Sequence, residues 1–215
     1  KAAKRADREA TNGIVVGRDG AMIQLAAETD FVAKNADFVS LADEIVGAVL
    51  ESGVSDLESA NAAKLSSGTS VQDAVTDLGA RLGENLSLAE AARFDGQTHL
   101  YLHRRAADLP PQVGVLIEYR GGDEGLAHQV AMQIASMNPR YVNRDAVPAD
   151  VVENERHIAE ATAREEGKPD KAIPRIVEGR LNGYYKDAVL VDQAAVWEDK
   201  KTVGALLDEA GAEVT

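Results

Sequence analysis

The stretch GIVVGRDGAMIQLAAETDFVAKNADFVSLADEIVGAVL, residues 13–50, contains the elements from which the fold can be read. Two apolar runs flank the turn Arg-Asp-Gly at residues 18–20, and an Asp-Gly turn between such runs is typical of a β-hairpin. After the link ETDFVAKN, apolar side chains recur at helical spacing: Phe38, Leu41, Ala42, Ile45 and Val49. Asn35 or Asp37 could cap that helix. The stretch therefore predicts a hairpin, a short link and an amphipathic helix.

The following residues repeat this order of elements. Residues 51–70 are rich in Ser, Gly, Asn and Asp and predict a loop that could contain a short helix, and an apolar stripe in residues 70–86 predicts a second helix. Residues 85–103 offer a strand, an Asp-Gly turn and a strand, and residues 110–137 offer a strand, a glycine turn and a helix. We therefore predict an α+β fold with two related subdomains, each a small antiparallel sheet packed with helices.

Two densely charged helical patterns occupy residues 148–187. Their apolar stripes are Val151, Val152, Ile158, Ala159 and Thr162, then Ile173, Ile176, Val177, Leu181 and Tyr184. The segment EGKPD between them ends one helix, so the pair is expected to form an antiparallel coiled-coil hairpin that projects from the body. We assign residues 1–97, with a linker helix over 1–12, to an N-terminal subdomain. Residues 98–147 and 188–215 then form a C-terminal subdomain.

Composition excludes several functional classes. The 215 residues include 36 acids and 23 Lys or Arg, a formal net charge of −13. Because nucleic acids and anionic membranes attract clustered Lys and Arg, neither is expected as a partner. There is no cysteine, which excludes disulfides and thiolate sites. No apolar run reaches membrane-spanning length and no signal peptide opens the sequence. A cysteine-free acidic chain suits the cytosol, so a cytoplasmic location is expected.

Catalytic and metal-binding motifs are also missing from the sequence. Of the four histidines, His99, His103, His128 and His157, only His99 and His103 lie four residues apart. They fall in a predicted strand with no third ligand in view, so the pattern of a zinc-binding helix is missing. There is no nucleophile elbow and no phosphate-binding loop. RGGDEG, residues 120–125, fits a turn with acids at a helix N-terminus. We therefore predict no cofactor, no metal and no catalytic residue, and binding instead of covalent chemistry.

Two aromatic residues have two interpretations each. Phe31 could pack beneath the helix it precedes, as apolar side chains commonly do. It could instead be presented to a partner beside Asp30, because an exposed aromatic on a rigid scaffold forms a binding hot spot. Trp197, the sole tryptophan, fits an interface anchor or a core residue equally well.

Several motifs, in one order from Lys1 to Thr215, resemble bacterial translation elongation factor Ts. They are ETDFVAKN, LGENL at residues 82–86, GKPDKAIPRIVEGRLNGYYKD and KKTVGALLDEAGAEVT. The resemblance implies the core of that family without its N-terminal ubiquitin-associated-like domain and without a final strand beyond GAEVT. The helical hairpin is similar to the coiled-coil arm of the family.

The resemblance implies a guanine-nucleotide exchange factor that binds elongation factor Tu, both GDP-bound and nucleotide-free, with no covalent step. In the family, one segment dislodges magnesium near the nucleotide of the GTPase; here it would be Thr29, Asp30, Phe31 and Val32. Residues matching contacts with the nucleotide-binding domain are Leu82, Gly83 and His103. Those matching contacts with another GTPase domain are Val196 and Trp197. The alternative is a helical interaction scaffold that has lost exchange activity, and homodimer contact through the hairpin stays open.

Overall fold

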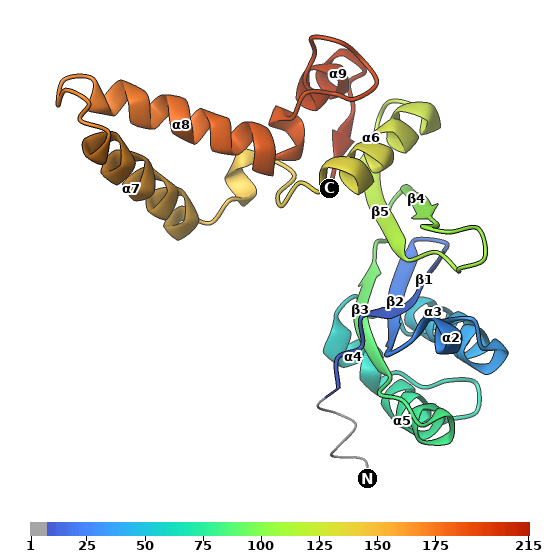
Figure 1. Cartoon of the computed structure of the whole chain (residues 1–215). Helices are drawn as coiled ribbons and strands as arrows, with labels where there is room; N and C mark the ends of the chain where they lie inside the picture. Colours follow the sequence, from blue (N-terminus) through green and yellow to red (C-terminus); the bar gives the residue numbers. More distant parts are fainter. Residues whose placement is uncertain (1–7) are drawn as a thin grey trace. The chain divides into compact units, whose positions relative to one another are not determined.

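The computed structural model describes residues 8–215 (Figure 1). Internal contacts divide the chain into two units, Lys1–Tyr119 and Arg120–Thr215, and each is described by itself. Of the linker helix predicted over residues 1–12, residues 1–7 lie outside the described part and residues 8–11 form no helix. The domain boundaries given above stay predictions.

The first unit is built on the predicted β-hairpin. Strand β1 (Asn12–Arg18) pairs antiparallel with β2 (Ala21–Ala27), and β2 pairs antiparallel with β3 (Ser87–Arg93), giving the order β1-β2-β3. Between β1 and β2, Asp19 and Gly20 both have positive φ, 49° and 89°. Primed hairpin turns use positive φ because their twist matches that of the strands. The Asp-Gly prediction is therefore confirmed.

The helices of this unit cover the sheet and enclose the core. They are α2 (Asp30–Ala33), α3 (Ala36–Ser52), α4 (Leu57–Ala62) and α5 (Val71–Leu82). Helix α3 lies against β1 and β2, and its five predicted apolar residues are all buried, with all but Leu41 fully so. Asn35 is the residue that caps α3, because its Oδ1 accepts from the N–H groups of Asp37 and Phe38.

Strands β4 (Thr98–His103) and β5 (Val113–Arg120) form a second pair of strands. The two-residue β6 (Glu213–Val214) lies near the end of the second unit. Strands β4 and β5 are antiparallel and lie beside the first sheet. Gly17 of β1 permits the approach, because a Cβ there would lie 2.6 Å from both terminal carbons of Leu100. The end of β4 therefore belongs to the same unit as the link after β2.

The second unit is mainly helical. It contains α6 (Glu124–Met137), η1 (Arg144–Ala146), α7 (Ala149–Glu165), α8 (Ile173–Ala188), η2 (Leu190–Asp192) and α9 (Val203–Glu209). The predicted turn before α6 is present, since Asp123 caps the helix by accepting from Leu126 N–H at 2.8 Å. None of the helices in residues 8–215 combines the length and apolar character that crossing a membrane requires.

Helices α7 and α8 lie side by side as the predicted helical hairpin (Figure 1). Ala159 and Ala163 of α7 pack against Ile173 and Val177 of α8. The assignment of Ile158 to this stripe is wrong, because its side chain is 49% exposed. Alanines four residues apart lie on one helical face, and Ile158 is turned away from that face.

With its sheets and covering helices, the structure confirms the α+β class and two subdomains.

Candidate functional site

The link ETDFVAKN presents one phenylalanine to solvent and the chain after it buries another. Thr29 caps the four-residue helix α2, and its Oγ1 accepts from Val32 N–H at 3.4 Å. Phe31 is 82% exposed, whereas Phe38, in the first turn of α3, is fully buried. The packing interpretation of Phe31 is therefore wrong, and the side chain is free to contact another molecule.

A single carboxylate fixes the start of this link. Glu84 Oε2 accepts from the backbone N–H groups of Glu28 at 3.1 Å and Thr29 at 3.2 Å. Its Oε1 accepts from the Thr29 hydroxyl at 2.5 Å. Hydrogen bonds to an ionised acceptor are shorter and stronger than neutral ones. The orientation of α2 is therefore set by a residue 55 positions further along the chain.

Glu28 makes the matching contact in the opposite direction, from the link to the residue after Glu84. Its Oε1 accepts from Asn85 N–H at 2.6 Å and from Arg8 Nη1 at 3.4 Å, and its backbone carbonyl accepts from Asn12 Nδ2 at 2.8 Å. The two motifs quoted above, ETDFVAKN and LGENL, are thus joined by reciprocal glutamates, which we call the Glu28–Glu84 clamp. Sequence reasoning missed this clamp. The only signal for it was Gly83, which could be expected to end a helix and reverse the chain before Glu84.

Two other predicted site residues lie directly before the clamp. Leu82 ends α5 and packs partly buried against the core. Gly83 follows as the left-handed C-cap, with φ 77° and an N–H that donates to the Gly79 carbonyl at 2.9 Å. It is exposed, and a Cβ added there would meet no atom within 4 Å. The structure therefore brings Leu82 and Gly83 to the link through Glu84.

His103 lies exposed at the end of β4. Its ring stacks on Tyr101 with 6.2 Å between centroids, and its Nδ1 lies 3.2 Å from the Tyr101 hydroxyl. The loop after His103 is tied to the link, because Lys34 Nζ contacts Asp108 Oδ2 at 2.7 Å. That hydrogen bond raises the pKa of Lys34 and lowers the pKa of Asp108. His103 thus precedes a loop that is itself joined to the end of α2.

Val196 and Trp197 lie in the second unit, in the loop between η2 and α9. Val196 is 56% exposed and Trp197 is partly exposed. Trp197 is therefore not a fully buried core residue, and both side chains are available at the surface. These two residues are neighbours in one loop, and they belong to a different unit from the link.

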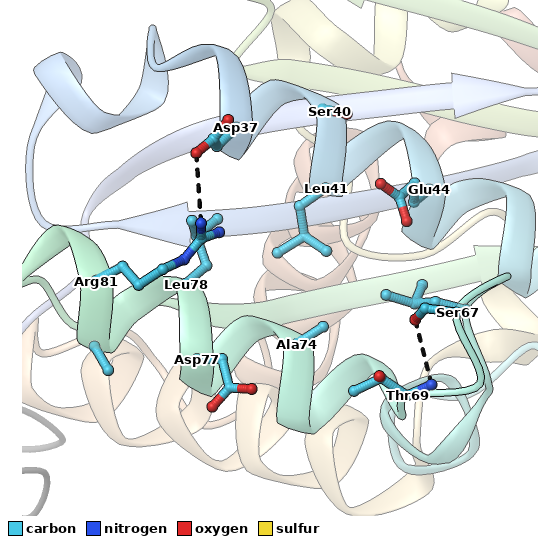
Figure 2. A pocket seen from close by; sticks show the side chains of 12 residues that line it. Asp37, Ser40, Leu41, Glu44, Ser67, Thr69, Ala74, Asp77, Leu78 and Arg81 are labelled. Atoms are coloured by element: carbon cyan, nitrogen blue, oxygen red, sulfur yellow. Dashed lines mark hydrogen bonds and ion pairs between the residues drawn. The ribbon is translucent and has the colours of Figure 1, made fainter.

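A groove of about 700 Å³ lies between α3 and α5 of the first unit (Figure 2). Asp37 and Arg81 meet at 3.8 Å at one end, and Leu41, Leu78 and other apolar residues lie between the two helices.

In the described part of the chain, no three His, Asp or Glu side chains are grouped to hold a metal ion. The arrangement that can act on another molecule is the exposed Phe31 on its fixed link, a geometry suited to protein contact.

Comparisons with known proteins agree in their result. Residues 28–215 match the family described as Elongation factor TS, so the match begins with the link. The chain is 56% identical over 212 residues to elongation factor Ts of Mycolicibacterium vanbaalenii, covering 99% of this chain and 78% of the relative. The elongation factor Ts proteins of Mycobacterium tuberculosis and Saccharopolyspora erythraea are 55% and 56% identical to it, with the same coverage of both chains. This chain belongs to the elongation factor Ts family.

Proposed function

We propose that the chain is a guanine-nucleotide exchange factor for elongation factor Tu in translation elongation. It promotes GDP release by wedging Asp30 and Phe31 near the nucleotide and magnesium of the GTPase. Membership of the family supports the role in elongation. The observation that carries the wedge is the 82% exposure of Phe31 on a link fixed by the Glu28–Glu84 clamp.

The energetics of such a contact are favourable. Transferring a phenylalanine side chain from water into a partner contributes about 1.5–3 kcal/mol. A segment whose backbone is already held in place loses less freedom on binding, which leaves more of that energy as affinity. The Glu84 carboxylate provides this order, since it holds the N–H groups before α2 at 3.1 and 3.2 Å. The backbone that carries Phe31 is therefore ordered before a partner binds.

Exchange then follows from linkage between two binding events. Magnesium binds oxygen ligands in a strict geometry and joins a GTPase to the phosphates of GDP. A factor that binds best when this geometry is disturbed weakens GDP, and GDP weakens the factor by the same ratio. Both the GDP-bound and nucleotide-free GTPase are thus partners, and no covalent bond is formed. The Asp30 carboxylate beside Phe31 adds a negative charge to the wedge.

The remaining site residues widen the contact in this proposal. Leu82, Gly83 and His103 meet the nucleotide-binding domain of the GTPase, which is supported by the ties of their segments to the link through Glu84 and Lys34. Val196 and Trp197 meet another domain, which is supported by their exposure. Homodimer contact through α7 and α8 stays a prediction.

Stopped-flow release of fluorescent GDP from elongation factor Tu tests the wedge. The parent chain, Phe31→Ala and Leu57→Ala are compared; Leu57 is a matched control because it is a 39% exposed apolar residue of the same unit. Since surface substitutions change stability by about 0.5 kcal/mol or less, both variants should melt like the parent. We expect Phe31→Ala to lower the maximal release rate about tenfold or more, as hot-spot truncations do, and Leu57→Ala to leave it unchanged.

Two outcomes would contradict the proposal in different ways. If Phe31→Ala released GDP as fast as the parent chain, the wedge mechanism would be refuted, and the role as an exchange factor would still stand. A parent chain that binds elongation factor Tu without speeding release would favour the scaffold alternative.

A further inference from the structure

Helix α6 contains a polar residue in a fully buried position. Gln133 has no exposed surface, and Gln193 after η2 is 1% exposed. Burying an amide is costly unless its hydrogen bonds are replaced inside the protein. The contacts of Gln133 therefore indicate what its burial stabilises.

Both ends of the Gln133 amide are used. Its Nε2 donates to Gln193 Oε1 and to the Ala194 carbonyl, each at 3.1 Å. Its Oε1 accepts from Val196 N–H at 2.9 Å. A carbonyl and the N–H two residues later are the pair that a neighbouring β-strand would bond. The Gln133 side chain thus acts toward the loop as a short piece of strand.

Other bonds close the same loop, residues 194–202. Gln193 Nε2 donates to the Asp187 carbonyl at 2.8 Å, and Ala195 N–H donates to the Lys201 carbonyl at 2.9 Å. Val203 N–H donates to the Gln193 carbonyl at 3.0 Å. With its ends held in this way, the loop presents Val196, 56% exposed, and the partly exposed Trp197.

We propose that Gln133 is a positioning residue that preforms the 194–202 loop as a second protein-contact surface. Its amide fixes the backbone on which Val196 and Trp197 are carried, so the loop binds a partner with little loss of freedom. The inference rests on the proposed function in taking these two residues as contacts with the GTPase. Gln133 itself is buried and touches no partner.

Hydrogen exchange on the unaltered chain tests the positioning without any variant. The Val196 N–H that bonds to Gln133 should exchange far more slowly than an open loop amide, because exchange requires the bond to open. Exchange of Val196 at the rate of an unbonded amide would overturn the proposal. Since this measurement needs no partner, its failure is distinct from failure of the proposed function.

A paired substitution then separates positioning from general stability. Gln133→Met keeps the volume and removes the amide, and Val130→Ala is the control because Val130 is also fully buried in α6. Trp197 is the sole tryptophan, so its fluorescence reports on the loop in the free chain. We expect greater acrylamide quenching of Trp197 in Gln133→Met than in Val130→Ala.

Affinity for elongation factor Tu gives the functional readout. Unpaired buried polar groups typically correspond to about a tenfold change in an equilibrium constant, which we expect as the affinity loss in Gln133→Met. If Gln133 acts through the loop, Val196→Ala should weaken binding less in the Gln133→Met background than in the parent. Fully additive losses, or equal losses in Val130→Ala, would mean that Gln133 only stabilises the fold. A parent chain with no affinity would refute the proposed function, and Val196 exchange and Trp197 quenching would still decide the positioning.

Discussion

Replacing Glu84 by alanine should release the link while leaving Phe31 in the chain. The substitution deprives the N–H groups of Glu28 and Thr29, and the Thr29 hydroxyl, of their shared acceptor. A hydrogen bond to a charged group contributes about 1.5–3 kcal/mol where water is excluded. These groups are only partly buried, so water can replace part of each bond. We therefore expect a total loss of about 2–3 kcal/mol.

The effect on exchange should differ in kind from that of Phe31→Ala. With Glu84 removed, α2 samples other orientations, and the apparent affinity falls by the fraction of chains in the competent one. A change of about 2 kcal/mol corresponds to roughly thirtyfold. Because Phe31 is still present, saturating concentrations of the variant should restore the maximal rate of GDP release. Phe31→Ala should lower the rate of GDP release even at saturating concentrations of the variant.

The assay is GDP release from elongation factor Tu measured as a function of factor concentration, with urea unfolding of each variant alongside. Ser70→Ala serves as the control, because it removes the N-terminal cap of α5, the helix that precedes Glu84, at about 1 kcal/mol without touching the link. If Glu84→Ala loses stability while its concentration dependence overlaps that of the parent, the clamp stabilises the fold and does not order the wedge.

Three further substitutions test other parts of the structure. Gly13→Ala should cost more than about 3 kcal/mol in thermal melts, since φ is 141° and the new Cβ would lie 2.1 Å from the Leu25 carbonyl oxygen. The pKa of Asp56 is lowered chiefly by the hydrogen bond from Ser59 N–H. The Asp56 carboxylate therefore stabilises the folded state fully above its ordinary pKa of 3.8, and this stabilisation is lost as pH falls through the lower pKa of the folded state. Asp56→Asn should therefore flatten the acid dependence of amide protection in α4. Arg144→Lys should lose about 1 kcal/mol in urea unfolding, and less at high salt, because lysine cannot reproduce both bonds to Asp192 at 2.9 and 3.1 Å.

Local sequence signals predicted the elements of this fold, because each signal acts within a few residues. The Asp-Gly turn determines the β1–β2 hairpin, and five apolar side chains at helical spacing determine the buried face of α3. Ile158 shows the limit of the same reasoning. Several apolar residues in α7 could form a stripe, and only packing on α8 selects the face with Ala159 and Ala163.

The candidate site was less accessible to such reasoning, since its order comes from contacts distant in sequence. Glu28 and Glu84 are ordinary surface acids in the sequence, and nothing periodic relates them. The burial of Gln133 is equally hard to predict from the sequence, because a single polar residue in an amphipathic helix predicts an exposed position. Both become functional hypotheses only when their partners, 55 and 63 positions away, are known.

The clamp also explains why Phe31 is more than an apolar residue left outside the core. Helix α2 has four residues and buries only Ala33, so it adds little to the core, and a helix of this length does not form by itself. It is nevertheless held by Glu84 at its start and by the Lys34–Asp108 pair at its end. These contacts fix the backbone of a segment whose most exposed side chain is Phe31. A fold that stabilises the backbone around Phe31 in this way is suited to presenting that ring to a partner.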